Sequence, residues 1–126
     1  MYKRQRYSEA SYALFISVEN HGDIVQKEGG SAGDYAVAKL SQALVKIRRQ
    51  SDIIGQTAVN EYALLLQRPV YESEPVDAAN RFAQSLGEME DLLNTSPTAA
   101  QIKVQLVSVP DGQTVIAHHI TKMSGA

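Results

Sequence analysis

The chain has 126 residues, of which 44% are hydrophobic and 21% charged, a composition typical of a globular protein with one core. The net charge of −2 provides no overall field that attracts nucleic acid or an anionic membrane, and the absence of cysteine excludes disulfides, thiolate catalysis and zinc–thiolate sites. No apolar run approaches the ~20 residues of a spanning helix, and no signal-type segment follows the basic start. We therefore expect a cytoplasmic protein.

The first elements are predicted as a strand and a short helical turn. Residues 12–18 (YALFISV) form a continuous apolar run, which is typical of a buried strand. One helical turn is expected at residues 24–27. Residues 28–33 contain three glycines and predict a loop, where Ser31 or Asp34 is expected to cap the next helix.

A long amphipathic helix and a β-hairpin are predicted next. Apolar residues recur at helical spacing over residues 35–48. The opposite face of this helix carries the polar and basic residues Lys39, Gln42, Lys46 and Arg49. Residues 52–57 and 62–66 are strand-like runs joined by a tight connection, which indicates a hairpin with Asn60 and Glu61 at its tip.

The second half of the chain is predicted to add one helix and two strands. Residues 69–75 are expected to form a loop, and residues 76–94 show the spacing of a second amphipathic helix. Residues 102–109 alternate between apolar and polar side chains, as strands do. A turn at residues 110–113 leads to a last strand at residues 115–120, expected at the edge of the sheet.

This order of elements predicts the α+β class. We expect a βαββαβ ferredoxin-like or palm-like sandwich, with helices packed on an antiparallel-rich central sheet and an extra C-terminal edge strand. Residues 1–126 are expected to form a single domain, with a peripheral N-terminal segment at 1–10 and a divergent C-terminal hairpin at 100–126. The pattern alone selects no function, because such folds host many.

Three motifs resemble one family of signalling domains. Residues 58–62 (AVNEY) and the apolar run after them resemble the signature pentapeptide and next strand of the GGDEF domain of diguanylate cyclases. Residues 13–20 (ALFISVEN) resemble the family's first strand with its pair of aspartates, and residues 28–34 (EGGSAGD) resemble its G-H-x-x-G-D loop. The resemblance covers residues 12–93 and implies a GGDEF-type fold.

The catalytic positions depart from the family pattern. Such cyclases hold two magnesium ions on a nucleotide triphosphate with carboxylates, and hard cations prefer anionic oxygen ligands. The matching positions here are Ser17 and Asn60, which bring no negative charge, and the two glycines of the pentapeptide are replaced by Ala58 and Val59. We therefore expect no catalytic residues, no bound metal, no cofactor and no enzymatic activity.

Other acidic positions of the family are kept only in part. Of the pair that contacts guanine, Asp34 is present, but Val25 stands where the family has asparagine. Glu19 and Glu61 remain, and two carboxylates alone do not make the metal site. The simplest interpretation of Glu61 is a solvated charge at the hairpin tip.

The inhibitory site of the family is matched more closely. Many GGDEF domains bind their product, cyclic di-GMP, through an R-x-x-D motif five residues before the pentapeptide and an arginine of the next helix. Here Arg49 and Asp52 stand at that spacing before Ala58, and Arg81 lies in the expected helix. The resemblance implies that these three residues bind cyclic di-GMP, with Arg48 as a further phosphate contact.

The chemistry of these residues suits a guanine nucleotide. An arginine fork pairs with the O6 and N7 acceptors of guanine and binds phosphate bidentately. An aspartate accepts hydrogen bonds from the N1–H and N2–H donors, which arginine cannot do. Arg49 and Asp52 are equally compatible with a surface ion pair worth ~0–1 kcal/mol, and Arg81 with an ordinary helix-surface charge.

The remaining candidates are weaker. His118 and His119 are adjacent on a predicted strand, so they point to opposite faces and are expected to be surface residues rather than metal ligands. Our hypothesis is an inactive cyclic di-GMP receptor that signals to a protein partner or a neighbouring domain, with a homodimer as one form. The alternative is a nucleotide-independent interaction or dimerisation module. Neither hypothesis involves a nucleic acid polymer or insertion into a membrane.

Overall fold

The structure, a computed structural model, describes residues 11–49, 53–66, 74–93, 97–109 and 111–121. The elements in chain order are β1 (Ser11–Val18), α1 (His21–Glu28), α2 (Gly30–Ile47), β2 (Ile53–Ala58), β3 (Glu61–Leu66), α3 (Glu74–Gly87), α4 (Glu90–Leu93), β4 (Ile102–Val109) and β5 (Thr114–Ile120).

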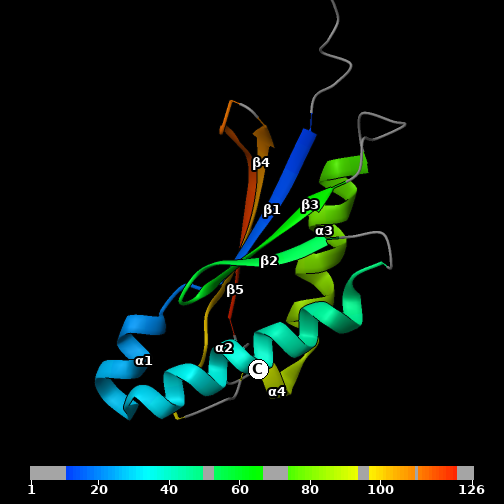
Figure 1. The fold of residues 1–126 in the computed structure, drawn as a ribbon. Helices are drawn as coiled ribbons and strands as arrows, with labels where there is room; N and C mark the ends of the chain where they lie inside the picture. The colour runs from blue at the N-terminus through cyan, green and yellow to red at the C-terminus, as the bar shows by residue number, and fades with distance from the viewer. Residues whose placement is uncertain (1–10, 50–52, 67–73, 94–96, 110, 122–126) are drawn as a thin grey trace, which may run out of the picture.

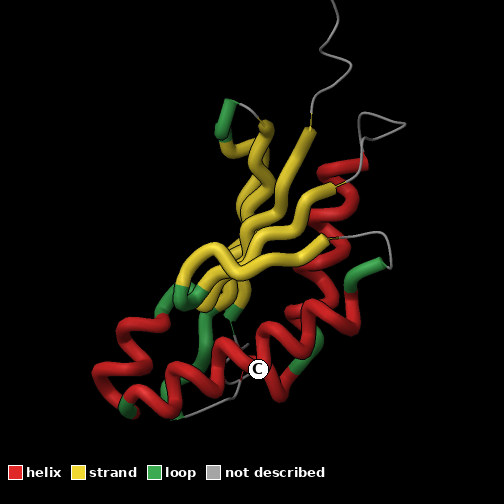
Figure 2. The backbone as a smooth tube through the Cα atoms, in the orientation of Figure 1, coloured by secondary structure: helices red, strands yellow, loops and turns green. Residues whose placement is uncertain are grey.

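The strands form a five-stranded sheet in the order β2-β3-β1-β4-β5, and all neighbouring strands are antiparallel. Figure 1 shows β1 in the middle of this sheet and the helices α2 and α3 beside it. In Figure 2 the strands lie together, with the helices to the side of the sheet and at its end. This architecture confirms the predicted α+β fold, including the extra C-terminal edge strand β5.

The core lies between the sheet and the helices, on what we call the covered face of the sheet. Leu14, Ile16 and Val18 of β1 are fully buried there, as alternation along a strand requires. They belong to one apolar cluster with buried residues of every helix, among them Leu40 and Phe82. Burial of each such side chain contributes about 1.5–3 kcal/mol, so this cluster fixes which face of β1 points inward.

On the opposite face, which we call the open face, the described helices bury no hydrophobic side chain, since the buried hydrophobic residues of all four helices belong to the core cluster. On this face Ala13 of β1 lies between Leu65 of β3 and Val107 of β4, and Leu65 lies next to Ile53 of β2. Ile53 is 62% exposed and Leu65 45% exposed. Ala13 and Val107 are buried, at 7% and 9% exposure, so the exposed apolar surface of these four residues lies on β2 and β3.

The region between β1 and β2 differs from the sequence prediction. The loop expected at residues 28–33 is wrong, because α1 continues to Glu28 and α2 begins at Gly30. The chain changes direction at Gly29 alone, whose φ of +99° lies in the region that favours glycine. The predicted cap by Ser31 or Asp34 is also wrong, since the N-cap is Gly29 and makes no side-chain hydrogen bond.

Packing explains why a glycine-rich segment is helical here. Gly33 is buried, and a Cβ atom added to it would lie 2.5 Å from Cγ2 of Val25 in α1. The absence of a side chain at Gly33 therefore lets α1 lie close against α2. Tertiary contact outweighs the low helix propensity of glycine, which costs about 1 kcal/mol per residue.

The second amphipathic segment is also interrupted. The helix predicted at residues 76–94 is divided into α3 and α4, with a break at Glu88 and Met89. Most of the loop predicted at residues 69–75 lies outside the described residues, as does the segment 1–10.

Both outer strand pairs contain an irregularity. The β2–β3 register shifts between Gln56 and Ala58, and the β4–β5 register shifts between Leu106 and Val107. Such bulges bend a strand and increase its local twist. The turn between β4 and β5 contains Gly112, with a φ of +75°, in agreement with the predicted turn.

Among the helices that the structure describes, none combines the length and the apolar character needed to cross a membrane.

Candidate functional site

The tip of the β2–β3 hairpin is fastened to the end of β1 by Asn60. The side-chain Nδ2 of Asn60 donates a hydrogen bond to the carbonyl oxygen of Val18 at 2.9 Å. In return, the backbone N–H of Val18 donates to the carbonyl oxygen of Asn60 at 2.9 Å. An ionised aspartate could not make the first bond, because a carboxylate only accepts. The amide of Asn60 thus connects two strands at the position where the family resemblance expects a metal-binding carboxylate.

The two carboxylates near this tip both have polar partners within the chain. Glu61 lies beside Ser17 on the open face, and its Oε1 accepts a hydrogen bond from Oγ1 of Thr57 at 2.8 Å. Oε1 of Glu19 lies 3.0 Å from Nδ1 of His119 on β5. Within the described residues, no group of three or more His, Cys, Asp or Glu side chains could hold a metal ion.

The adjacent histidines of β5 lie on opposite faces of the sheet, as the sequence predicts. Nε2 of His118 is 2.8 Å from Oδ1 of Asn80 on α3, on the covered face. His119 lies on the open face, opposite Lys103 in the strand register, and pairs with Glu19. The two side chains therefore do not converge on one ligand.

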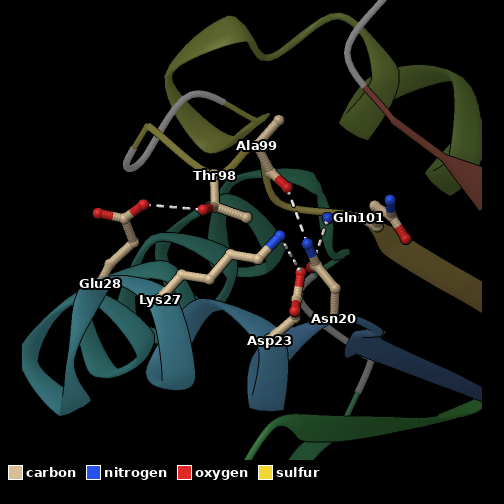
Figure 3. A network of polar contacts seen from close by, with 7 residues as sticks. All are labelled: Asn20, Asp23, Lys27, Glu28, Thr98, Ala99 and Gln101. Atoms are coloured by element: carbon tan, nitrogen blue, oxygen red, sulfur yellow. Dashed lines mark hydrogen bonds and ion pairs between the residues drawn. The ribbon is translucent and has the colours of Figure 1, made fainter.

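A second asparagine extends the pairing of β1 and β4 beyond the strand ends. Nδ2 of Asn20 donates to the carbonyl oxygen of Ala99 at 2.8 Å, and Oδ1 of Asn20 accepts from the N–H of Gln101 at 2.8 Å (Figure 3). Beside it, Oγ1 of Thr98 donates to Oε2 of Glu28 at 2.8 Å. These bonds tie the start of α1 and its last residue to the segment that leads into β4.

The position matching the family's guanine-binding asparagine has an apolar contact instead. Val25 is half-buried on α1, and its methyl group packs against Gly33 of α2. Nε2 of His21 is buried in the same contact and has no hydrogen-bond partner among the described residues; a Cβ atom added to Gly33 would lie 3.0 Å from it. Asp34, the retained member of the pair, is exposed. This region is built by packing between α1 and α2.

The predicted ligand arginines lie after the end of α2 and on α3. α2 ends at Ile47, Arg48 is its C-cap residue with an extended backbone, and Arg49 follows as an exposed residue before β2. Arg81 is half-buried on α3, with its guanidinium 5.3 Å from the ring centre of Phe82. α2 and α3 contact each other. Asp52 lies outside the described residues, so its part in this site stays a prediction.

A pocket of about 340 Å³ lies beside the polar face of α2. One wall carries Lys39 and Lys46 of α2, and the other carries Glu88 and Asp91 at the junction of α3 and α4. The remaining lining residues are Gln42, Ala43, Met89 and Leu92. The basic face that the sequence predicts for α2 therefore borders a concave surface with charges of both signs.

Comparison with solved structures finds GGDEF domains with the same fold. The GGDEF domain of YfiN (TpbB) from Pseudomonas aeruginosa superposes with a TM-score of 0.66 at 20% identity, over 83% of this chain and 61% of that chain. The fold is that of GGDEF domains. The diguanylate cyclase SiaD from P. aeruginosa, in complex with its activator SiaC, matches with a TM-score of 0.65 at 18% identity, over 87% of this chain and 42% of that chain.

A third GGDEF fold carries a ligand. The GGDEF domain of DgcB from Caulobacter crescentus, in complex with c-di-GMP, matches with a TM-score of 0.63 at 8% identity, over 83% of this chain and 63% of that chain. No protein-family model and no curated protein sequence matches this chain. The present chain thus shares the fold of GGDEF domains at low sequence identity and spans less than two thirds of these neighbours.

Sequence reasoning missed the structural role of two amides. Asn20 follows the end of β1 and Asn60 faces it. The side chains of both form hydrogen bonds to backbone atoms far away in the sequence. The available signal in the sequence was a polar residue beside a strand end. The bonding partner, however, is 79 residues away for Asn20 and 42 residues away for Asn60. Only the fold reveals them.

Proposed function

We propose that this chain is a catalytically inactive GGDEF-like domain that acts as a cyclic di-GMP receptor and signals to a protein partner. The observation that carries the proposal is the location of Arg49, exposed at the end of α2 and directly before β2, with Arg81 on the contacting helix α3. The ligand would be held by Arg49, Asp52 and Arg81, with Arg48 as a phosphate contact.

The loss of synthesis is supported by the groups around the hairpin tip. Ser17 and Asn60 offer no anionic oxygen, and the amide of Asn60 is already bonded to Val18. Val59 is 67% exposed at the position where the family has a glycine that lets backbone approach phosphate. A magnesium–nucleotide complex would lack its ligands there. We expect no turnover of GTP with magnesium or manganese.

The ligand-binding part of the proposal is tested by calorimetry with cyclic di-GMP. At 100 times its dissociation constant, a ligand stabilises the folded chain by ~2.7 kcal/mol. For 126 residues this corresponds to a rise in melting temperature of roughly 10 °C. Arg49→Ala and Arg81→Ala should each remove both the heat signal and the thermal shift.

A matched control separates a specific site from general attraction to a cation. Lys27 on α1 is an exposed cation whose partner is Asp23, 3.4 Å away on the same helix. Lys27→Ala should bind cyclic di-GMP as the unmodified chain does. If the unmodified chain gives neither heat nor thermal shift at tens of micromolar ligand, the receptor proposal fails.

The second candidate is a nucleotide-independent interaction module on the same fold. It is favoured by the apolar open face, where Ile53 is 62% exposed and Leu65 is 45% exposed. The SiaD neighbour is a GGDEF protein in complex with a protein activator, which is a precedent for association of this fold with another chain. This candidate predicts no effect of cyclic di-GMP on the melting temperature.

A further inference from the structure

The open face is organised in rows that run across the strands. One row is apolar and joins Ile53, Leu65, Ala13 and Val107 as successive neighbours. The next row, two residues further along β1, contains Phe15 between Ala63 and Gln105. The last row is polar and joins Glu61, Ser17, Lys103 and His119.

The polar row has opposite charges on the two sides of β1. Glu61 of β3 lies on one side of Ser17, and Lys103 of β4 lies on the other. The two backbones are two strand spacings apart, about 10 Å. Neither Glu61 nor Lys103 forms an ion pair with another described residue of the chain. The charges of Glu61 and Lys103 are thus available to a surface with the reverse order, whereas His119 is paired with Glu19.

We propose that the open face pairs with the open face of a second copy of this chain, about a two-fold axis parallel to β1. Such an axis places each row of one copy opposite the same row of the second copy. It also places the β3 side of one copy opposite the β4 side of the other. Leu65 then faces Val107 of the second copy, and Phe15 faces Phe15. Glu61 faces Lys103 of the second copy, and the same pair forms again on the other side, as an isologous interface requires.

Electrostatics selects this axis over the other in-plane two-fold axis. An axis perpendicular to the strands would place the polar row of one copy against the apolar row of the other. Glu61 and Lys103 would then be buried without partners, which costs several kcal/mol per charge. With the axis parallel to β1, Leu65 meets Val107 and the carboxylate of Glu61 meets the ammonium group of Lys103. At the rim of the interface Ile53 meets Thr114 of β5.

The expected dimer is a weak one. Five strands spaced about 4.8 Å apart and about six residues long give a face of roughly 24 by 20 Å. Aligned sheets pack about 10 Å apart, so the side chains of both faces interdigitate. A face of this size, roughly 480 Å² per partner, is smaller than the about 800 Å² per partner of a standard interface and belongs to the size class of weak, transient contacts. The dimer should therefore dissociate on dilution, with a dissociation constant in the micromolar range.

Sedimentation velocity of the full chain over a concentration series tests the proposal, without any nucleotide present. The unmodified chain should shift from monomer to dimer as its concentration rises. Leu65→Asp should remain a monomer throughout. Val45→Asp is the matched control, because Val45 is 57% exposed on α2, away from the open face, and this variant should still dimerise.

A charge reversal tests the geometry itself and does not depend on an apolar substitution. Glu61→Lys and Lys103→Glu should each weaken dimerisation at least tenfold, since each places like charges opposite each other. The double variant should recover dimerisation, because the order of charges is only reversed. A monomeric unmodified chain, equal effects of Leu65→Asp and Val45→Asp, or a double variant as weak as the single ones would each overturn the proposal. None of these measurements depends on cyclic di-GMP, so the two proposals can fail separately.

Discussion

Replacing Asn60 by aspartate restores the residue type of the GGDEF pattern, and the structure predicts that it destabilises the fold. The substitution removes the hydrogen bond from Nδ2 to the carbonyl oxygen of Val18, 2.9 Å long, which is worth about 1 kcal/mol. It also sets an ionised carboxylate against that carbonyl oxygen, which costs roughly another 1 kcal/mol. For 126 residues, a loss of ~2 kcal/mol lowers the melting temperature by about 8 °C.

Urea unfolding at two pH values measures this effect. Asn60→Ala is the matched variant, because it loses the bond without adding a charge, and it should lose only about 1 kcal/mol. The protonated form of the introduced carboxyl can donate to Val18, so its pKa is raised in the folded state. A group with a raised folded-state pKa loses stability as the pH rises through that pKa. The deficit of Asn60→Asp should therefore shrink from about pH 7.5 to about pH 4.5, whereas that of Asn60→Ala should not change.

Two results would refute this reasoning. One is an Asn60→Asp variant as stable as the unmodified chain at neutral pH. The other is a deficit equal to that of Asn60→Ala at both pH values, which would mean that no carboxylate–carbonyl repulsion exists at the tip. Aspartate at this position should restore no GTP turnover, because Ser17 still supplies no carboxylate.

Further substitutions test the hydrogen bonds of Asn20 and the packing between α1 and α2. Asn20→Ala removes two hydrogen bonds of 2.8 Å and should lower the free energy of unfolding by about 2 kcal/mol in a urea titration. Gly33→Ala should cost about 1–3 kcal/mol, because the new Cβ would lie 2.5 Å from Val25, and adding Val25→Ala should recover part of the loss. Gly22→Ala, the same substitution on α1 with nothing within 4 Å, should instead leave stability unchanged or raise it by up to about 1 kcal/mol; a loss like that of Gly33→Ala would contradict the packing argument.

The strands could be predicted from the sequence because their side chains follow the physics of one sheet. β1 and β4 are apolar where they meet the core, and the short connections between β2 and β3 and between β4 and β5 make these two pairs neighbours. The predicted strand at residues 12–18 agrees with β1 to within one residue. Their pairing order follows from the βαββαβ pattern, since each crossover needs a helix to return the chain.

The helices between β1 and β2 could not be predicted fully, because their limits depend on contact rather than on propensity. The glycines of residues 28–33 indicate a loop when each is considered alone. In the fold, Gly33 is the position where Val25 of the neighbouring helix approaches. That requirement for a small residue is visible only when both helices are present.

For the candidate site, the charged residues could be located from the sequence, but the residues that they contact could not. The location of Arg49 between α2 and β2 agrees with the prediction, and Arg81 lies on α3 as expected. The pairing of Glu19 with His119 spans 100 residues and could not be anticipated from spacing. Whether Arg49, Asp52 and Arg81 bind a ligand together stays a prediction.

The bulges in the two outer strand pairs determine how this protein can grow into larger assemblies. A regular edge strand offers unpaired N–H and C=O groups to any other chain, and this is how sheets extend into fibres. Here the shift near Ala58 in β2–β3 and the shift at Val107 in β4–β5 interrupt the regular ladder beside both edges. Association through the face of the sheet, by contrast, consumes that face in a single pair. The molecule is thereby suited to assemblies that stop at a fixed number of copies.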